Sequence, residues 1–351
     1  MASCSAFGSS SEVTLWYAED QEVADSSDGL GQLADGDPIE WLPINITGES
    51  ISTNLSSAVS EQITANRSYA GSKLTQGEVS GSFNYEMQAS SFIYDMLISV
   101  LQANKTAAFE GTTNWAGAEG IKNGSTKHCF AILKRVAVAS GNYDWYVFRG
   151  VQASSMSCDI SPNALLTGTV NIMGVRPDTP IEAAATVTGW TFATPENLPL
   201  MSGVDSLKNF AISAWDGAQF VETDVTMQSV TINFDNQLRQ QQAVGINSIY
   251  AAGVASGRFK ATFSGSAYYA DPKVYNAFVN DTTIRITGQL VDSDGDGLQF
   301  DSGFVKVTSG AIPMAGGPDQ DLMISTEFQA FEDVTPVTGT GTVTVTKITT
   351  A

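Results

Sequence analysis

Basic residues are scarce in this 351-residue chain: 17 lysines and arginines stand against 37 aspartates and glutamates, a formal net charge of −20. Tight binding to nucleic acid phosphates or to anionic lipid surfaces needs clustered basic side chains, so the charge balance argues against both. It leaves room for a weak, non-adhesive relation to DNA. Hydrophobic residues make up 42% of the chain, enough for a buried core, which argues against disorder.

Cysteine and histidine are rarer still, with three and one copies. So few cysteines exclude a disulfide scaffold and favour a reducing compartment. The one histidine, His128, precedes Cys129, and neighbours on a strand point to opposite faces, which argues against a Cys–His nucleophile pair. A zinc site would be short of ligands. Without a phosphate-loop, dinucleotide or nucleophile motif, we expect no enzyme, no cofactor and no bound metal.

Long apolar runs are missing too. No stretch of about 18 apolar residues offers a membrane helix. Residues 1–20 lack the basic segment and apolar run that are typical of a signal peptide. We therefore expect no membrane partner, and assembly in the cytoplasm of the cell that makes the protein.

Alternation of apolar and polar residues dominates the rest of the chain. In 78–88, Val79, Phe83 and Tyr85 fall on one face and the polar residues between them on the other, and 259–269 repeats this pattern. The pattern predicts a mainly-β fold. Only two helices are expected, Ser90–Gln102 with a broad apolar face and Asp271–Asn280, which opens on Asp271 as N-cap and on Pro272.

The sequence of expected elements occurs twice. Each half gives a strand, a polar loop, a glycine-containing strand, a helix, a hairpin and a closing strand. Residues match at a nearly constant separation, and the matched pairs are Ile51 with Val230, Phe83 with Phe263, and Tyr94 with Tyr275. Two copies of this length indicate two like domains rather than a solenoid.

The duplication divides the chain into four parts. Residues 1–38 are an N-terminal arm with one strand-like run at 13–17, residues 39–200 the first domain and residues 201–333 the second. Residues 334–351 are a C-terminal tail that alternates valine and threonine. We expect the tail to form an edge strand that pairs with a neighbouring subunit.

Several stretches, taken in order, resemble the tail tube proteins of siphophages, the bacteriophages with long non-contractile tails. The first copy supplies 46–55, 61–69 and 77–83, and the second supplies 229–239, 257–265, 310–323 and 328–331. The resemblance covers residues 40–333 and rests on the order of the segments, seen twice.

The resemblance implies two tandem tail-tube-like β-sandwich or barrel domains, each with one α-helix, in a subunit that forms stacked rings. Some members of the family carry two domains per chain and form trimeric rings, so the duplication favours a homotrimer with pseudo-sixfold symmetry over a homohexamer. It further implies tail terminator, tape measure and distal tail proteins as partners. Double-stranded DNA would pass in transit without specific binding. The location implied is the virion tail, after assembly in the host cytoplasm.

The polar loops 56–73 and 235–256 precede equivalent strands, and family members use this loop for stacking between rings. Arginine and tyrosine are enriched at interfaces. The alternative is that these side chains are solvated loop residues. The candidate contacts between subunits or rings are Glu61, Arg67, Tyr69, Arg239 and Tyr250.

Two further interpretations of the acidic residues stay open. Asp292, Asp294 and Asp296 resemble the start of a calcium loop, but Gly303 stands where a bidentate glutamate is needed, so a turn rich in Asp and Gly is expected instead. Carboxylates facing a channel would repel DNA, or they serve solubility alone. The rival functions are a β-sandwich that binds carbohydrate or a host receptor, and a glycan-cleaving virion enzyme, which would need two positioned carboxylates.

Overall fold

The computed structural model describes most of the chain. The described residues are 13–20, 39–62, 66, 68–104, 120–138, 142–178, 190–223, 225–244, 248–269, 273–310, 321–332 and 342–349. Arg67, Asp271 and Pro272 therefore lie outside the described residues, as does most of the predicted N-terminal arm.

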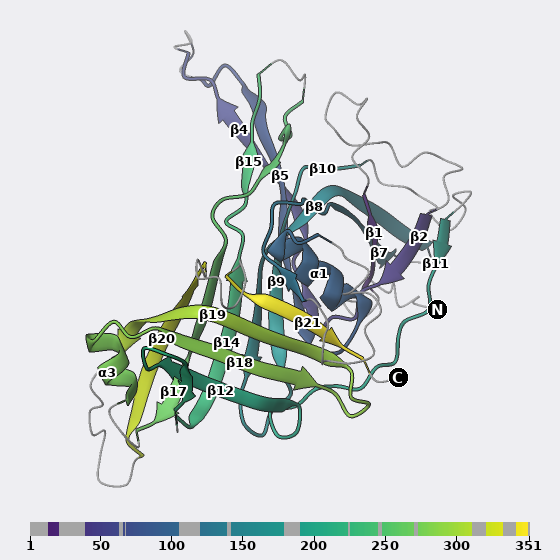
Figure 1. Cartoon of the computed structure of the whole chain (residues 1–351). Coiled ribbons are helices and arrows are strands. Elements are labelled where there is room, and N and C mark those ends of the chain that lie inside the picture. Colours follow the sequence, from purple (N-terminus) through teal and green to yellow (C-terminus); the bar gives the residue numbers. More distant parts are fainter. Residues whose placement is uncertain are drawn as a thin grey trace.

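The mainly-β prediction is confirmed, because both halves of the chain consist mainly of strands (Figure 1). The first unit contains β1 (Val13–Glu19), β2 (Ile39–Pro43), β3 (Gly48–Glu49), β4 (Ser52–Val59), β5 (Ser72–Glu86), α1 (Ser91–Leu101), β6 (Ile121–Lys122), β7 (Phe130–Val138), β8 (Asn142–Ile160), β9 (Thr167–Gly174), β10 (Arg176–Pro177) and β11 (Trp190–Phe192). The second contains β12 (Leu207–Trp215), β13 (Phe220–Glu222), β14 (Met227–Asp235), β15 (Arg239–Gln241), β16 (Gly253–Ala255), β17 (Lys260–Tyr268), α3 (Lys273–Val279), β18 (Ile284–Val291), β19 (Gly297–Gly310), β20 (Met323–Phe331) and β21 (Thr344–Ile348).

The two units repeat the same strand pairings. In the first unit the pairing order is β2–β1–β7–β8–β9–β5, with β5 then paired to β3 and β4. In the second it is β13–β12–β18–β19–β20–β17–β14. β1 thus occupies the place in the first unit that β12 occupies in the second. The strand-like run at 13–17 is part of a sheet, paired with β7 along its whole length.

The residue matches inferred for the duplication need one correction. In the first unit Phe83 faces Glu49, and in the second Phe263 faces Ile232. Matching Ile51 with Val230 therefore excludes matching Phe83 with Phe263 within the same hairpin. Because side chains alternate with period two, an even-numbered shift keeps the same face buried, so sequence alone does not reveal it.

The predicted core faces are confirmed. Val79, Phe83 and Tyr85 of β5 are buried, as are Ala261 and Phe263 of β17. The helix predicted at 90–102 is observed as α1, which begins after the N-cap Ser90 and ends before Gln102. The N-cap hydroxyl accepts a hydrogen bond from the backbone N–H of Ile93, satisfying a donor that the first turn leaves unpaired. Nine residues of α1 are buried, so it fills the space between the sheets.

One long strand joins the two units. The first part of β8 pairs with β7, and its last part, Ser155–Ile160, pairs with β9 on one side and with β14 on the other. The strands of both units thereby form one continuous run in the order β4–β5–β9–β8–β14–β17–β20–β19, with β3 continuing β4 along β5. This eight-strand run, called the joint sheet below, does not close on itself within the described part of one chain.

The C-terminal strand β21 pairs within its own chain. It pairs with β19 of the second unit along one edge, and Thr344 and Val345 pair with β6 of the first unit along the other. Lys347 lies over the ring of Tyr94 in α1, 4.4 Å from its centroid. A strand is thus observed in the predicted C-terminal tail. Its pairing with a neighbouring subunit stays a prediction, because β6 covers only the start of its second edge.

A buried ion pair holds the end of β1. The Arg149 guanidinium donates to both carboxylate oxygens of Asp20, at 2.8 and 2.6 Å, and the backbone N–H of Gly150 donates to the same carboxylate at 3.0 Å. The side chains of Arg149 and Asp20 are 1% and 2% exposed. Asp178, which is 32% exposed, accepts one further bond from Arg149. These bonds raise the pKa of Arg149, although burial alone would lower it.

Candidate functional site: open sheet edges, a polar face and projecting loops

The joint sheet ends in two open edges. At one end, β3 and β4 pair with β5 alone among the described strands. At the other end, the part of β19 from Lys306 to Gly310 pairs with β20 alone, again counting the described residues. The equivalent part of β8 uses both of its edges, because it also pairs with β14. Open edges expose unpaired N–H and C=O groups that recruit further strands.

One face of the joint sheet is mainly polar in both units, although Met173, Tyr268, Met323 and Phe331 also lie on it. The opposite face is part of the buried core, so buried and more exposed side chains alternate along these strands. Hydroxyl and amide side chains outnumber carboxylates on this polar face. The polar face consists of Ser80, Ser82, Asn84, Glu86, Ser155, Ser157, Asp159, Thr167, Thr169, Asn171, Thr231, Asn233, Asp235, Lys260, Thr262, Ser264, Ser266, Lys306, Ser309, Ser325, Glu327 and Gln329.

Many side chains of the polar face bond to one another across strands. Thr231 donates to Asp159 at 2.6 Å, across the junction between the two units. Asn171 donates to Ser155 at 2.8 Å, and Thr169 donates to Asn84 at 3.0 Å. Donors that are engaged within the sheet are not available to an outside acceptor, and cationic groups are few here. The face is therefore wettable without being an anion-binding surface.

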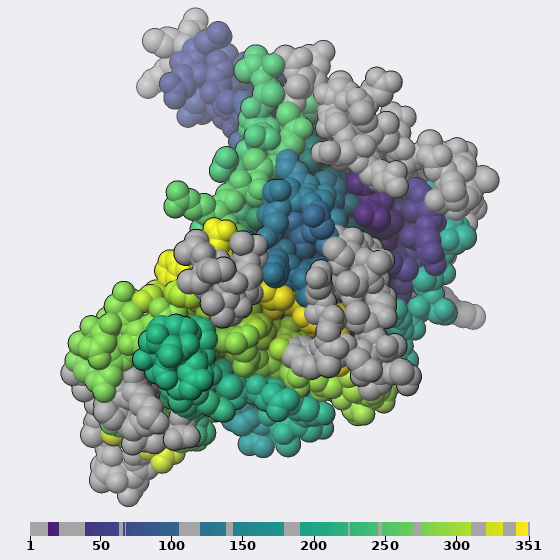
Figure 2. Space-filling view, viewed as in Figure 1, coloured from purple at the N-terminus to yellow at the C-terminus, as the bar shows by residue number. Residues whose placement is uncertain are grey.

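A two-stranded ribbon projects from one end of the joint sheet. It comprises β4 and the first part of β5, Ser72–Gln76, and we call it the β4–β5 hairpin; it stands clear of the body in the space-filling view (Figure 2). Glu61 and Tyr69 lie in the connection between its strands and are exposed, Tyr69 to 81%. Arg67 belongs to the same connection but lies outside the described residues.

The second unit contributes a loop beside this hairpin. β15 and β16 form a small antiparallel sheet, and Arg239 at its start is exposed. Tyr250 behaves differently, because its ring packs against the backbone of Gly77 in β5, where Gly77 also donates its N–H to Ile249. The structure thus brings the loops of the two units together, with Tyr250 turned inward and Arg239 outward.

The first carboxylate of the acidic turn at 292–297, that of Asp292, accepts hydrogen bonds from the turn itself. Asp292 is buried, and one of its carboxylate oxygens accepts the backbone N–H groups of Asp294 and Asp296, each at 2.9 Å. Such an arrangement is typical of turns rich in Asp and Gly. Within the described ranges, no three His, Cys, Asp or Glu side chains are grouped to hold a metal ion.

The rare chemistry-bearing side chains lie apart from any reactive arrangement. A ring nitrogen of His128 is 2.7 Å from the carbonyl oxygen of Ala103, whereas Cys129 is buried beside Gln152. Cys158 lies on the core face of β8, and burial raises the pKa of its thiol to about 12. A thiol held neutral in this way is a poor nucleophile.

Sequence reasoning missed three of these features. The open edges follow from which strands pair, and the polar face follows from two units sharing one sheet. The ion pair joins Asp20 to Arg149 far along the chain. The sequence signal for the polar face was the polar side of each alternating strand. That signal identifies the polar side of a single strand, but it does not show that these sides form one surface across the β8–β14 pairing.

Comparison with known proteins identifies the group to which these features belong. The family model described as phage tail tube protein matches residues 10–330, which is most of the chain and takes in both units apart from β21. A comparison with curated proteins finds no match. Neither helix in the described part of the chain is long and apolar enough to span a membrane. The chain belongs to the phage tail tube protein family.

Proposed function

We propose that this chain is the major tail tube subunit of a siphophage, and that three copies close into a ring whose stacked repeats conduct DNA. Family membership makes it a structural protein of the virion tail. The observation that carries the finer proposal is the pair of open edges at the two ends of the joint sheet.

The junction inside one chain is the template for the junction between chains. β14 of the second unit pairs with the end of β8 in the first unit. By the repeated pairing order, β3 and β4 are the counterparts of β14, and Lys306–Gly310 of β19 is the counterpart of the end of β8. The edge of β19 in one chain would therefore pair with β3 and β4 of the next. Such a contact is heterologous and closes by rotation, removing both open edges of the joint sheet.

The width of the channel favours three chains. Neighbouring strands lie about 4.8 Å apart, so 24 strands give a circumference of about 115 Å and a backbone diameter of about 37 Å before tilt. Side chains reaching inward by about 5 Å on each side leave about 27 Å. The 16 strands of a dimer would leave a channel of about 15 Å. The two grooves of a DNA duplex are each about 8 Å deep, so a duplex is wider than this channel.

The polar face is the surface that we assign to the channel. Some of its hydroxyls and amides bond to one another, and its carboxylates outnumber its two lysines, one of which, Lys306, is paired with Asp281. DNA phosphates would meet few cationic groups and a mildly repulsive field that decays over about 8 Å. DNA would then pass without adhering, as ejection requires.

The remaining parts of the proposal concern partners and boundaries. Assembly would take place in the host cytoplasm, with tail terminator, tape measure and distal tail proteins as further partners and no catalysis. The arm, the domains 39–200 and 201–333 and the tail remain our division of the sequence, with β1 added to the first unit by its pairing. Glu61, Arg67, Tyr69 and Arg239 are proposed contacts between rings or subunits.

Electron microscopy of the concentrated protein, together with the mass of isolated rings, tests the proposal. Rings or tubes with three chains per ring, about 111 kDa from a chain of 37.1 kDa, are expected. Six chains per ring would contradict the trimer. A protein that stays monomeric at every concentration would contradict the tube function itself.

A further inference from the structure

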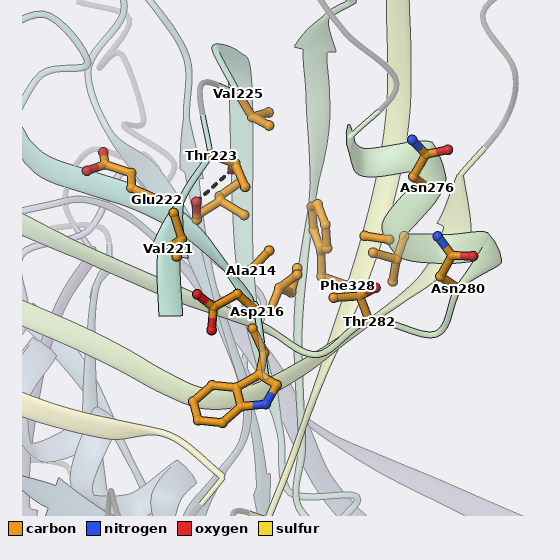
Figure 3. Close-up of a pocket in the computed structure, with 15 residues that line it drawn as sticks. Ala214, Asp216, Val221, Glu222, Thr223, Val225, Asn276, Asn280, Thr282 and Phe328 are labelled. Carbon is orange, nitrogen blue, oxygen red and sulfur yellow. Dashed lines mark hydrogen bonds between the residues drawn. The ribbon is translucent and has the colours of Figure 1, made fainter. Parts of the chain in front are cut away.

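An apolar groove opens in the second unit, away from the polar face. It encloses about 430 Å³ between β12, β13, α3 and the core side of the joint sheet. Ala214, Val221 and Phe328 supply apolar surface, and Val221 is 46% exposed. Figure 3 shows Asp216 and Glu222 on the side of the groove opposite α3. Exposed apolar surface of this kind, rimmed by polar groups, marks an interaction site.

The corresponding place in the first unit is a smaller cavity of about 190 Å³ beside β1, β2, α1 and the start of β7. Tyr17, His128 and Phe130 line it where Ile212, Thr282 and Ile284 line the groove. Acidic side chains and His128 make up more of this smaller cavity. The groove of the second unit is therefore the larger and more apolar of the two, and it is the better receptor for apolar side chains.

The β4–β5 hairpin has the opposite property, since it carries apolar side chains that nothing covers. Leu55, Val59 and Leu74 are 51%, 52% and 47% exposed, and Tyr69 is the most exposed tyrosine described. A two-stranded ribbon without a packed face is only marginally stable in water. Burying these side chains against an apolar surface would stabilise the hairpin at about 25 cal/mol per Å² of apolar area.

Position and charge match the hairpin to the groove. β4 projects from one end of the molecule, whereas α3 and β12 lie at the other (Figure 1), so two copies stacked end to end bring the two features together. The sequence from Ser52 to Gln76 has one glutamate and two basic residues, a net positive segment in a chain of net charge −20. The groove rim presents Asp216 and Glu222. Opposite charges across a contact favour the correct pairing.

We propose that the β4–β5 hairpin of one copy seats its apolar side chains in the groove of the second unit of a copy in the next ring. The contact is heterologous and does not close, so it propagates along the tube. This inference rests on the proposed stacking of rings. It adds the receiving surface, and it assigns ring closure and ring stacking to different residues.

Charge substitutions separate the two assemblies. Leu55→Asp combined with Leu74→Asp in the hairpin, and Val221→Asp in the groove, should each leave rings intact and abolish tubes under the microscope. Tyr146→Asp is the matched control, because it adds the same charge at a side chain 38% exposed on the outer β7–β8 sheet, and it should still form tubes. Unchanged circular dichroism would show that each variant is folded.

A cross-link tests the contact directly. In a Cys4→Ser background the remaining cysteines, Cys129 and Cys158, are buried. Leu74→Cys with Val221→Cys should give, on oxidation of tubes, a ladder of multiples of the chain, and either cysteine alone should not. Tubes that form without a ladder, or a Val221→Asp protein that forms tubes normally, would overturn the inference. A parent protein that forms no rings would overturn it together with the proposed function.

Discussion

Replacing Asp20 by asparagine removes one charge from the most deeply buried ion pair that the structure describes. The substitution keeps the shape of the side chain but removes the charge of the carboxylate that accepts two bonds from the Arg149 guanidinium, which is 1% exposed. Breaking a buried pair by removing one partner costs about 3–5 kcal/mol, because the remaining charge is desolvated without compensation. That loss corresponds to a change of more than a hundredfold in the folding equilibrium.

The change in the free energy of unfolding can be measured on the monomeric protein by denaturation with guanidinium chloride, monitored by tryptophan fluorescence. Asp178→Asn is the matched control. Its carboxylate is 32% exposed, accepts a bond of 3.2 Å from Arg149 and lies 3.7 Å from Arg176, so water replaces these contacts at a cost of about 1 kcal/mol or less. Replacing both buried partners, Asp20→Leu with Arg149→Met, should recover most of the loss. An Asp20→Asn protein no less stable than Asp178→Asn would refute the reasoning, and β1 would then be held mainly by its pairing with β7.

Three further predictions follow from the sheets and the buried acids. Thr308→Pro should abolish rings while leaving the monomer folded, because the register with β20 skips Thr308 and proline is tolerated at bulges and on edge strands. Thr308→Val should form rings, and rings in the proline variant by microscopy would contradict the assigned edge. Gly168→Ala should lower the free energy of unfolding by about 1–3 kcal/mol, since the new methyl group would lie 2.1 Å from the backbone oxygen of Ser157. Gly253→Ala is the control, because its methyl group would have no neighbour nearer than 3.8 Å, and it should have little effect in the same denaturant titration. Stability should fall as pH rises from about 9 towards 12. Burial raises the pKa of Cys158 from 9.0 to about 12 and also raises the pKa of Tyr17 and Tyr85, so the unfolded chain loses protons that the folded chain keeps. A thermal midpoint that stays constant from pH 8 to pH 11 would contradict this prediction.

Ring closure and ring stacking would draw on different parts of the same chain. The backbone edges of β19 and β3–β4 would join subunits within a ring, and the hairpin and the groove would join rings. Backbone pairing is insensitive to most side-chain changes, whereas the stacking contact depends on a few apolar side chains. Variants that stop at rings would therefore be found in the hairpin and the groove, and variants that stop at monomers would be found on the sheet edges.

The sequence by itself determined the local elements of this protein. Period-two alternation identified β5 and β17 and the side chains that they bury, and the apolar face of 90–102 identified α1, because these patterns depend only on backbone geometry within one element. The order of elements, seen twice, was enough to indicate two like units. The charge balance was enough to argue against tight phosphate binding.

Tertiary structure alone decided how these elements join. The end of β8 pairs with β14, β21 is enclosed between β19 and β6, and Asp20 meets Arg149, because sheet edges and buried charges take their partners from anywhere along the chain. The polar side of each strand was legible in the sequence, but its continuity across both units depends on the β8–β14 register. The open edges and the groove likewise depend on the folded structure, since they lie where the described residues leave backbone groups unpaired and apolar side chains exposed.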